Sequence, residues 1–249
     1  MPTATAPMAT EPAATLTHAP SRRRRRPYAD IGARLAGVGA IAFAAVVVLQ
    51  NIIRGGSAPS NGASGEAVLA YYVDHRATTF VLVATYVLSG AGLATFLGGA
   101  MRRLLAGSRP GWAITGFVGI AGVMALFAVV VAAEQALSVL ATGDQPDLGA
   151  IEALWALHNS AFSVLSLSLA IALLGLARAG VGAGLTPRAF ELLAPAGAGL
   201  LALGAIAGPA IAAGDAMPVF GLSAVGFAVW LAFLVSTGLR LVRSDRSRA

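Results

Sequence analysis

The chain of 249 residues contains no cysteine and no lysine, and charged residues make up only 11% of it. The lack of cysteine excludes disulfides, thiolate metal sites and cysteine nucleophiles. The low charge is unusual, because an average soluble domain has roughly 25% charged residues. The chain is instead 57% hydrophobic with a mean hydropathy of +0.78, which is more apolar surface than a soluble core of this size needs. The composition therefore predicts an integral membrane protein.

Long apolar runs fill most of the chain. A helix rises about 1.5 Å per residue and the hydrocarbon core is about 30 Å thick, so a crossing needs about 20 apolar residues. Six runs reach this length and predict an all-α, polytopic bundle of six transmembrane helices within one membrane domain, residues 28–242. Pro209 should kink the fifth span, because proline removes a backbone donor. The predicted spans are 31–53, 79–100, 112–133, 153–177, 192–213 and 219–241.

The basic residues indicate how the bundle is oriented. All 17 are arginine, and in a six-span topology all but Arg54 and Arg76 flank the spans on the side of the chain termini. Positive residues favour the cytoplasmic side, so both termini are expected there. Residues 1–27 are predicted to be a disordered tail that ends in an arginine run, and residues 243–249 a short basic tail. Because the arginines lie beside the spans, we interpret them as orientation signals and expect no nucleic-acid partner.

The use of arginine without lysine, with abundant alanine and glycine, is typical of a GC-rich bacterial genome. The first apolar run is longer than the core of a secretory signal and lacks a convincing cleavage site, so we interpret it as an uncleaved anchor. We therefore expect a multi-pass protein of the bacterial plasma membrane, with the lipid bilayer as its first partner.

The fourth predicted span stands out because it carries polar side chains. Glu152, Asn159 and Ser166 recur at a seven-residue spacing, which puts them on one stripe of the helix. His158 lies about 100° around the helix from Asn159. A histidine within a membrane span is uncommon and indicates a binding or proton-handling role. A structural hydrogen bond to a neighbouring helix also explains it, and both interpretations stay open.

A second polar cluster, YYVDHR, lies just before the second span. A short helix there would stack Tyr71 on His75 and Tyr72 on Arg76, because residues four apart share a face. The cluster is either an interfacial aromatic belt or a lid and anion-recognition edge over the mouth of the bundle. With Glu134 at the end of the third span, these groups predict a shallow pocket open to the outside. The candidate binding residues are Tyr72, Asp74, His75, Arg76, Glu134, His158 and Asn159.

Other chemistries lack the residues they need. Only Arg34 and Arg240 are charged within the predicted spans, so no buried carboxylate is available at midplane to couple transport to an ion. A haem held between two helices needs paired histidines, and only His158 lies in a span. The remaining histidine and acidic residues show no metal-ligand spacing. We therefore predict no cofactor, no metal site and no catalytic residue.

Four short motifs occur in the order of the predicted topology: YYVDHR before the second span, the pair Arg102 and Arg103 closing it, ALWALHNSAF opening the fourth and LTPRAF before the fifth. In these motifs and in topology, residues 31–241 resemble the uncharacterised six-helix integral membrane proteins of actinobacteria and related bacteria that form a domain of unknown function. The resemblance implies a multi-pass membrane protein and no established activity.

The sequence favours a non-enzymatic function. The leading hypothesis is an integral membrane protein that binds or passes a small or lipid-like molecule through an outward-facing pocket that includes His158. The alternative is a membrane-embedded enzyme that modifies a lipid head group, with His75 or His158 as general base and Arg76 holding an anion. A third interpretation is a structural or regulatory partner whose arginine-rich tail contacts anionic lipid or a cytoplasmic protein.

Overall fold

The computed structural model of the chain describes residues 28–55 and 58–243. Every regular element of secondary structure in these residues is a helix, and short loops join the helices. The predicted disordered tail 1–27 lies outside the described residues, as does the second tail beyond residue 243. The helices are α1 (Tyr28–Arg54), α2 (Gly65–Asp74), α3 (Arg76–Leu105), α4 (Pro110–Leu140), α5 (Leu148–Gly182), α6 (Phe190–Ile206), α7 (Gly208–Ala212) and α8 (Met217–Arg243).

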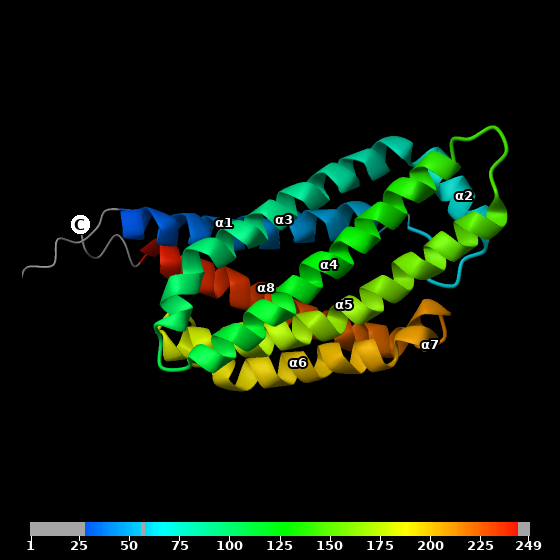
Figure 1. Ribbon diagram of the computed structural model, residues 1–249. Helices are drawn as coiled ribbons and strands as arrows, with labels where there is room; N and C mark the ends of the chain where they lie inside the picture. The colour runs from blue at the N-terminus through cyan, green and yellow to red at the C-terminus, as the bar shows by residue number, and fades with distance from the viewer. Residues whose placement is uncertain (1–27, 56–57, 244–249) are drawn as a thin grey trace, which may run out of the picture.

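The long helices run side by side, and the short helices α2 and α7 lie at one end of the bundle (Figure 1). The start of α1 and the end of α8 lie together at the opposite end. α4 packs along α5, α1 packs along α3, and α6 contacts both α5 and α8. The two described ends of the chain therefore share one side of the bundle.

Five helices, α1, α3, α4, α5 and α8, are long and apolar enough to cross a membrane by length and composition, which is the pattern of a multi-pass membrane protein. The fifth predicted span, 192–213, is not one continuous helix. It is divided into α6, which is apolar but shorter, and α7, with Ala207 between them. The break lies just before Pro209, because the proline ring clashes with the carbonyl four residues earlier and its nitrogen carries no hydrogen to donate. The predicted distortion at Pro209 is thus confirmed, as a break rather than a kink.

Several helices extend beyond the predicted spans. α4 continues to Leu140, seven residues past the predicted end at 133. The helices that are long enough to cross a membrane therefore also contain Arg54 and Glu134. The expectation that only Arg34 and Arg240 are charged concerned the shorter predicted spans and stays a prediction. The prediction ended the third span before its first charged residue. A charged group that is paired inside a bundle does not end a membrane helix.

Glycines allow the closest helix contacts. Gly116 of α4 and Gly175 of α5 face each other, and a Cβ added at Gly175 would lie 2.6 Å from the Cα of Gly116. Gly92 of α3 packs on Gly39 of α1, where an added Cβ would lie 2.9 Å from the Gly39 carbonyl oxygen. Small residues of this kind let membrane helices approach backbone to backbone. The pairs α4–α5 and α1–α3 are joined in this way.

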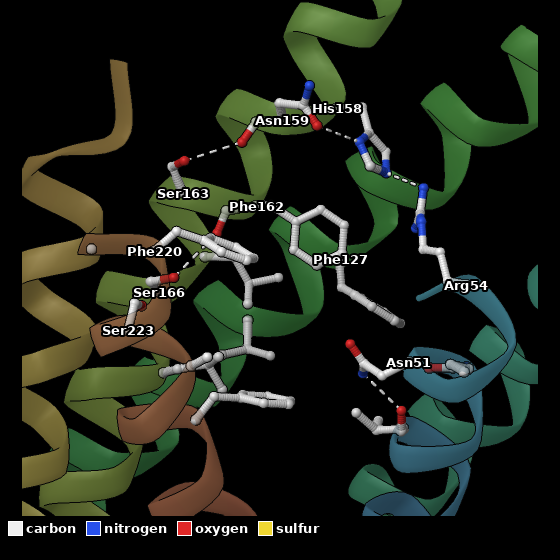
Figure 2. A pocket seen from close by; sticks show the side chains of 18 of the residues that line it. Asn51, Arg54, Phe127, His158, Asn159, Phe162, Ser163, Ser166, Phe220 and Ser223 are labelled. Atoms are coloured by element: carbon white, nitrogen blue, oxygen red, sulfur yellow. Dashed lines mark hydrogen bonds between the residues drawn. The ribbon is translucent and has the colours of Figure 1, made fainter. Parts of the chain in front are cut away.

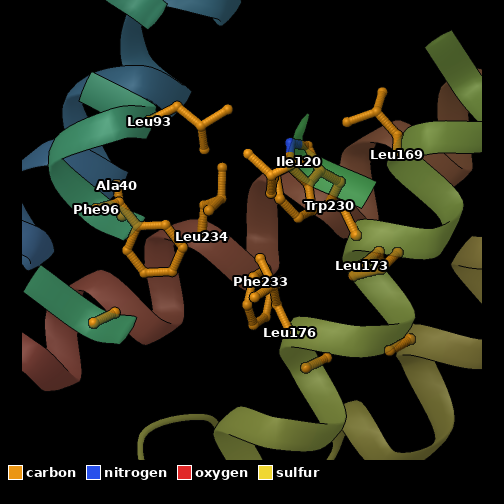
Figure 3. Close-up of a cluster of buried hydrophobic side chains, with 14 of the residues drawn as sticks. Ala40, Leu93, Phe96, Ile120, Leu169, Leu173, Leu176, Trp230, Phe233 and Leu234 are labelled. Atoms are coloured by element: carbon orange, nitrogen blue, oxygen red, sulfur yellow. The ribbon is translucent and has the colours of Figure 1, made fainter. Parts of the chain in front are cut away.

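Large apolar side chains fill the half of the bundle that is nearer the described chain ends (Figure 3). Trp230 and Phe233 of α8 are 0% and 1% exposed. They lie between Phe96 of α3 and the leucines Leu173 and Leu176 of α5. This core closes one half of the bundle and leaves the polar residues to the other half.

Gly175→Ala is expected to destabilise the bundle. The added methyl group would press on backbone atoms of Gly116 and Trp112, which can yield only if α4 and α5 separate. We expect the free energy of unfolding to fall by about 1–3 kcal/mol, the usual cost of overpacking, as measured by unfolding in detergent. Gly98→Ala on α3 is the matched control, because nothing lies within 4 Å of its added Cβ. An equal loss in both variants would show that this glycine contact does not hold α4 and α5 together.

Candidate functional site

A short helix at the end of the bundle positions the first side chain of the site. α2 begins at Gly65, whose N–H donates to Glu152 Oε1 of α5 (3.0 Å). Its apolar face packs on Leu137 of α4 and Trp155 of α5. These contacts hold Tyr72, which is 1% exposed, with its phenol directed towards α4.

The centre of the site is a buried ionic network on one carboxylate. Glu134 of α4 is 1% exposed and accepts hydrogen bonds from Arg54 Nη2 of α1 at Oε1 and from Tyr72 Oη at Oε2 (2.7 Å). His158 Nε2 of α5 lies 2.9 Å from the same Oε1. Arg54 Nη1 also donates to Tyr86 Oη of α3 (2.8 Å). The network therefore joins five helices, α1 to α5.

The hydrogen bonds around His158 assign the proton on one of its ring nitrogens. Asn159 Nδ2 donates to the backbone carbonyl of Asn61 (3.0 Å), which fixes the orientation of the amide. The amide oxygen Oδ1 therefore accepts from His158 Nδ1 (3.1 Å). Because Nε2 faces Glu134, both ring nitrogens of His158 are engaged.

The segment that follows α1 covers this end of the bundle. Trp155 stacks on the His158 ring, with 4.9 Å between centroids and 7° between planes. Its indole Nε1 donates to the carbonyl of Ser60 (3.1 Å). Asn61 Nδ2 in turn donates to the carbonyl of Ile211 at the end of α7 (3.1 Å), which also accepts from the Gly214 N–H (3.0 Å). These bonds tie the segment to both α5 and α7.

A cavity of about 330 Å³ extends from this network into the bundle (Figure 2). Arg54, His158 and Asn159 lie at its polar end, followed along α5 by Ser163 and Ser166. Sites for small molecules have volumes of about 300 Å³ and above, with mostly apolar walls and a few polar groups. This cavity has that composition. Its apolar wall includes Phe43, Val47, Leu93, Phe127, Leu169 and Phe227.

Four of the seven predicted binding residues converge at this site. Tyr72 donates to Glu134, Glu134 contacts His158, and His158 contacts Asn159. His158 and Asn159 line the cavity, whereas Tyr72 and Glu134 lie behind its wall. Two members of the predicted polar stripe of α5, Asn159 and Ser166, border this cavity.

The other three predicted residues are not in the network. Asp74 and Arg76 are exposed, and His75 is half-buried between α2 and α3. The predicted stack of Tyr71 on His75 is confirmed, with 4.7 Å between ring centroids. The second predicted stack is replaced by another contact, because Tyr72 is held by the Glu134 carboxylate.

Sequence reasoning missed Arg54, Tyr86, Asn61 and Trp155 as members of the site. Arg54 carried a usable signal, since it was one of only two arginines assigned to the arginine-poor side. A lone arginine on that side indicates that a carboxylate in a neighbouring helix pairs with it. The other three residues gave no signal, because single tyrosine and tryptophan residues are ordinary in membrane helices and at their interfaces, and Asn61 lies outside the predicted spans.

Among residues 28–55 and 58–243, no group of three or more histidine and acidic side chains is arranged to hold a metal ion. Comparisons of the chain with family models, with curated proteins and with solved structures find no match. The function is therefore argued from the site itself.

Glu134→Leu is expected to lower the free energy of unfolding by about 3–5 kcal/mol, because Arg54 would remain buried without its counter-charge. Combining it with Arg54→Met removes both charges and should restore much of that loss. Unfolding of the single and double variants in detergent measures the difference. The half-exposed pair Arg109 and Glu191 is the control (2.7 Å), and Glu191→Leu should cost under about 1 kcal/mol. A double variant no more stable than Glu134→Leu would contradict the proposed pairing.

Burial, and secondly the Glu134 carboxylate, raise the pKa of the Tyr72 phenol above its ordinary value. A pKa that is raised in the folded state gives a contribution that is complete below the unfolded value of about 10 and is lost as the pH rises further. Tyr72→Phe should therefore lower the unfolding temperature by a constant amount between about pH 6 and pH 9. The difference from the wild type should shrink above about pH 10. A difference that grows with pH would contradict the phenol-to-carboxylate bond.

Proposed function

We propose that the protein is a bacterial plasma-membrane protein that binds or passes a small, lipid-like amphipathic molecule in the central cavity. The observation that carries this proposal is the two-part wall of the cavity, which is polar at the end formed by Arg54, His158 and Asn159 and mainly apolar elsewhere. An amphipathic molecule matches both parts. A fully polar solute would lose its hydration against the apolar wall without gaining hydrogen bonds there.

Arg54 is the side chain best placed to hold the head group of such a molecule. Arginine has five N–H donors. Within the described part of the chain, the bonds of Arg54 to Tyr86, Glu134 and His158 involve only its two terminal nitrogens and leave Nε without a partner. The side chain is 18% exposed and borders the cavity. These donors suit an acceptor-rich head group such as a carboxylate or a phosphate.

We also propose that α6 and α7 together form a sixth crossing and that both termini are cytoplasmic. Only Ala207 separates the two helices. The side of the bundle that holds the described chain ends is rich in arginine, which favours the cytoplasmic face, so the network and its covering segment would face outwards. This topology agrees with the resemblance to six-helix actinobacterial membrane proteins, which stays a prediction. The arginines on the chain-end side are Arg34, Arg102, Arg103, Arg109, Arg178, Arg188, Arg240 and Arg243.

The geometry favours binding over the lipid-modifying alternative. A general base needs a nitrogen that is free to reach the proton it removes. Both ring nitrogens of His158 are already engaged, by Asn159 and by Glu134. His75 stacks on Tyr71 and is absent from the residues that line the cavity. The third interpretation, a partner role for the arginine-rich tail, concerns residues outside the described ranges and stays a prediction.

A cavity-filling variant tests the proposed binding. Gly90 of α3 borders the cavity, and its added Cβ would meet only Met124 Cε, at 3.5 Å. Gly90→Leu should therefore fill the cavity with little backbone strain. We expect laurate or lauryl phosphate to raise the unfolding temperature of the wild type, because a ligand stabilises the state it binds. Gly90→Leu should lose that rise.

Gly98→Leu is the matched control for this experiment, because the same residue is added to the same helix where the added Cβ meets nothing within 4 Å. It should keep the full temperature rise. An equal rise in Gly90→Leu would mean that the amphipath binds elsewhere. No rise in the wild type with either compound would contradict the proposed function.

A further inference from the structure

We infer that the ligand enters the cavity sideways from the bilayer, through a cleft between α1 and α8, and that it is a single-chain amphipath with an acidic head. This inference rests on the proposed function and adds to it both a route and a ligand class.

The cleft is a hollow of about 320 Å³ on the side of the bundle. Three residues, Asn51 of α1 and Ala224 and Phe227 of α8, line both the cleft and the central cavity. Figure 2 shows Asn51 across the cavity from the α8 residues Phe220 and Ser223. The hollow on the surface and the cavity inside therefore share a wall at these three side chains. The remaining residues of the cleft are Val48, Ile52, Ala228 and Leu231.

The cleft exists because α1 and α8 touch at one end and separate towards the other. At the touching end, a Cβ added to Gly37 of α1 would lie 2.6 Å from the Gly238 carbonyl of α8. Val48, the first α1 residue of the cleft, is eleven residues further on, which is about 16 Å along the helix. Over that length the two helices part enough for a hollow to form between them.

The side chains at the cleft are suited to contact with lipid chains. Ile52 is 71% exposed and Val48 is 45% exposed. The polar exception, Asn51, donates one of its two amide hydrogens from Nδ2 to the Val47 carbonyl of its own helix (2.8 Å). At the polar end of the cavity, Asn61 lies in the wall and is bonded to both α5 and α7. The lateral cleft is thus the less obstructed route.

The position of the cleft along α1 and the volume of the cavity indicate the class of ligand. Asn51 lies three residues before Arg54, which is about one helical turn, so an acidic head moving through the cleft passes the guanidinium of Arg54. A cavity of about 330 Å³ is near the lower limit of small-molecule sites, which favours one chain over two. A fatty-acid-like molecule from the bilayer meets both conditions.

Ala228 provides the test, because it borders the cleft but not the cavity and is exposed. The probe is a stearate with a nitroxide close to the carboxylate, which quenches Trp155 when it binds beside it. Vesicles containing the probe are mixed with the protein in nanodiscs, and Trp155→Phe gives the background from the other tryptophans. Ala228→Phe should slow quenching about tenfold or more, since its ring blocks entry without adding a fluorescent tryptophan, and leave the final extent unchanged.

Two further variants protect the experiment from folding artefacts. Ala94→Phe places the same side chain at an exposed site on α3 and should bind at the wild-type rate. Because the chain has no cysteine, Ala228→Cys can be purified first and then modified with a bulky, reducible thiol reagent. Modification should slow quenching, and reduction should restore the rate.

The outcomes separate the route from the proposed function. If the wild type binds the probe and blocking position 228 leaves the rate unchanged, the lateral route is wrong and the cavity remains a binding site. If the wild type shows no saturable quenching of Trp155, both the route and the proposed function fail. If the unmodified stearate competes but stearyl alcohol competes equally well, the acidic head is wrong.

Discussion

The buried pairing of Glu134 with Arg54 and His158 is the interaction on which the rest of the site depends. Moving these groups out of water is costly, and each partner is tolerated only because the others are present. Since the partners come from α1, α4 and α5, with Tyr72 and Tyr86 added from α2 and α3, their register is set at this point. A shift of any one helix along its axis would leave a charge unpaired in the bundle.

Different interactions hold the two halves of the bundle together. Near the described chain ends, glycines let backbones touch and large apolar side chains such as Trp230 fill the space between helices. At the other half, hydrogen bonds between charged and polar groups join the helices. The cavity lies between these two regions, since neither close backbone contact nor the network occupies that part of the bundle. Its mixed character follows from this position.

Most of the helices could be predicted from the sequence, because an apolar run long enough to cross a membrane forms few structures other than a helix. The interruption before Pro209 also follows from local chemistry. Only part of the site could be predicted from the sequence. His158 and Asn159 were noticeable as polar groups within a span, whereas Arg54 and Glu134, eighty residues apart, were judged separately as span ends. Hydropathy treats a charge as the end of a helix and has no means of detecting a partner that neutralises it inside. The cleft depends on the angle between α1 and α8, which only the packed structure contains.

A purely structural role does not readily explain why this network borders a cavity. Buried ion pairs are often no more stabilising than apolar side chains of similar volume, and an apolar set at these positions would pack the bundle at lower desolvation cost. For a charged group that also contacts a ligand, additional hydrogen bonds offset the desolvation cost, because the ligand head group accepts from donors that other protein groups do not use. Arg54 is in that position, with its terminal nitrogens held by Tyr86 and Glu134 and its side chain bordering the cavity. Glu134 then serves to orient the guanidinium, as His158 and Tyr72 orient Glu134, and the proposed ligand would meet a wall that is already ordered.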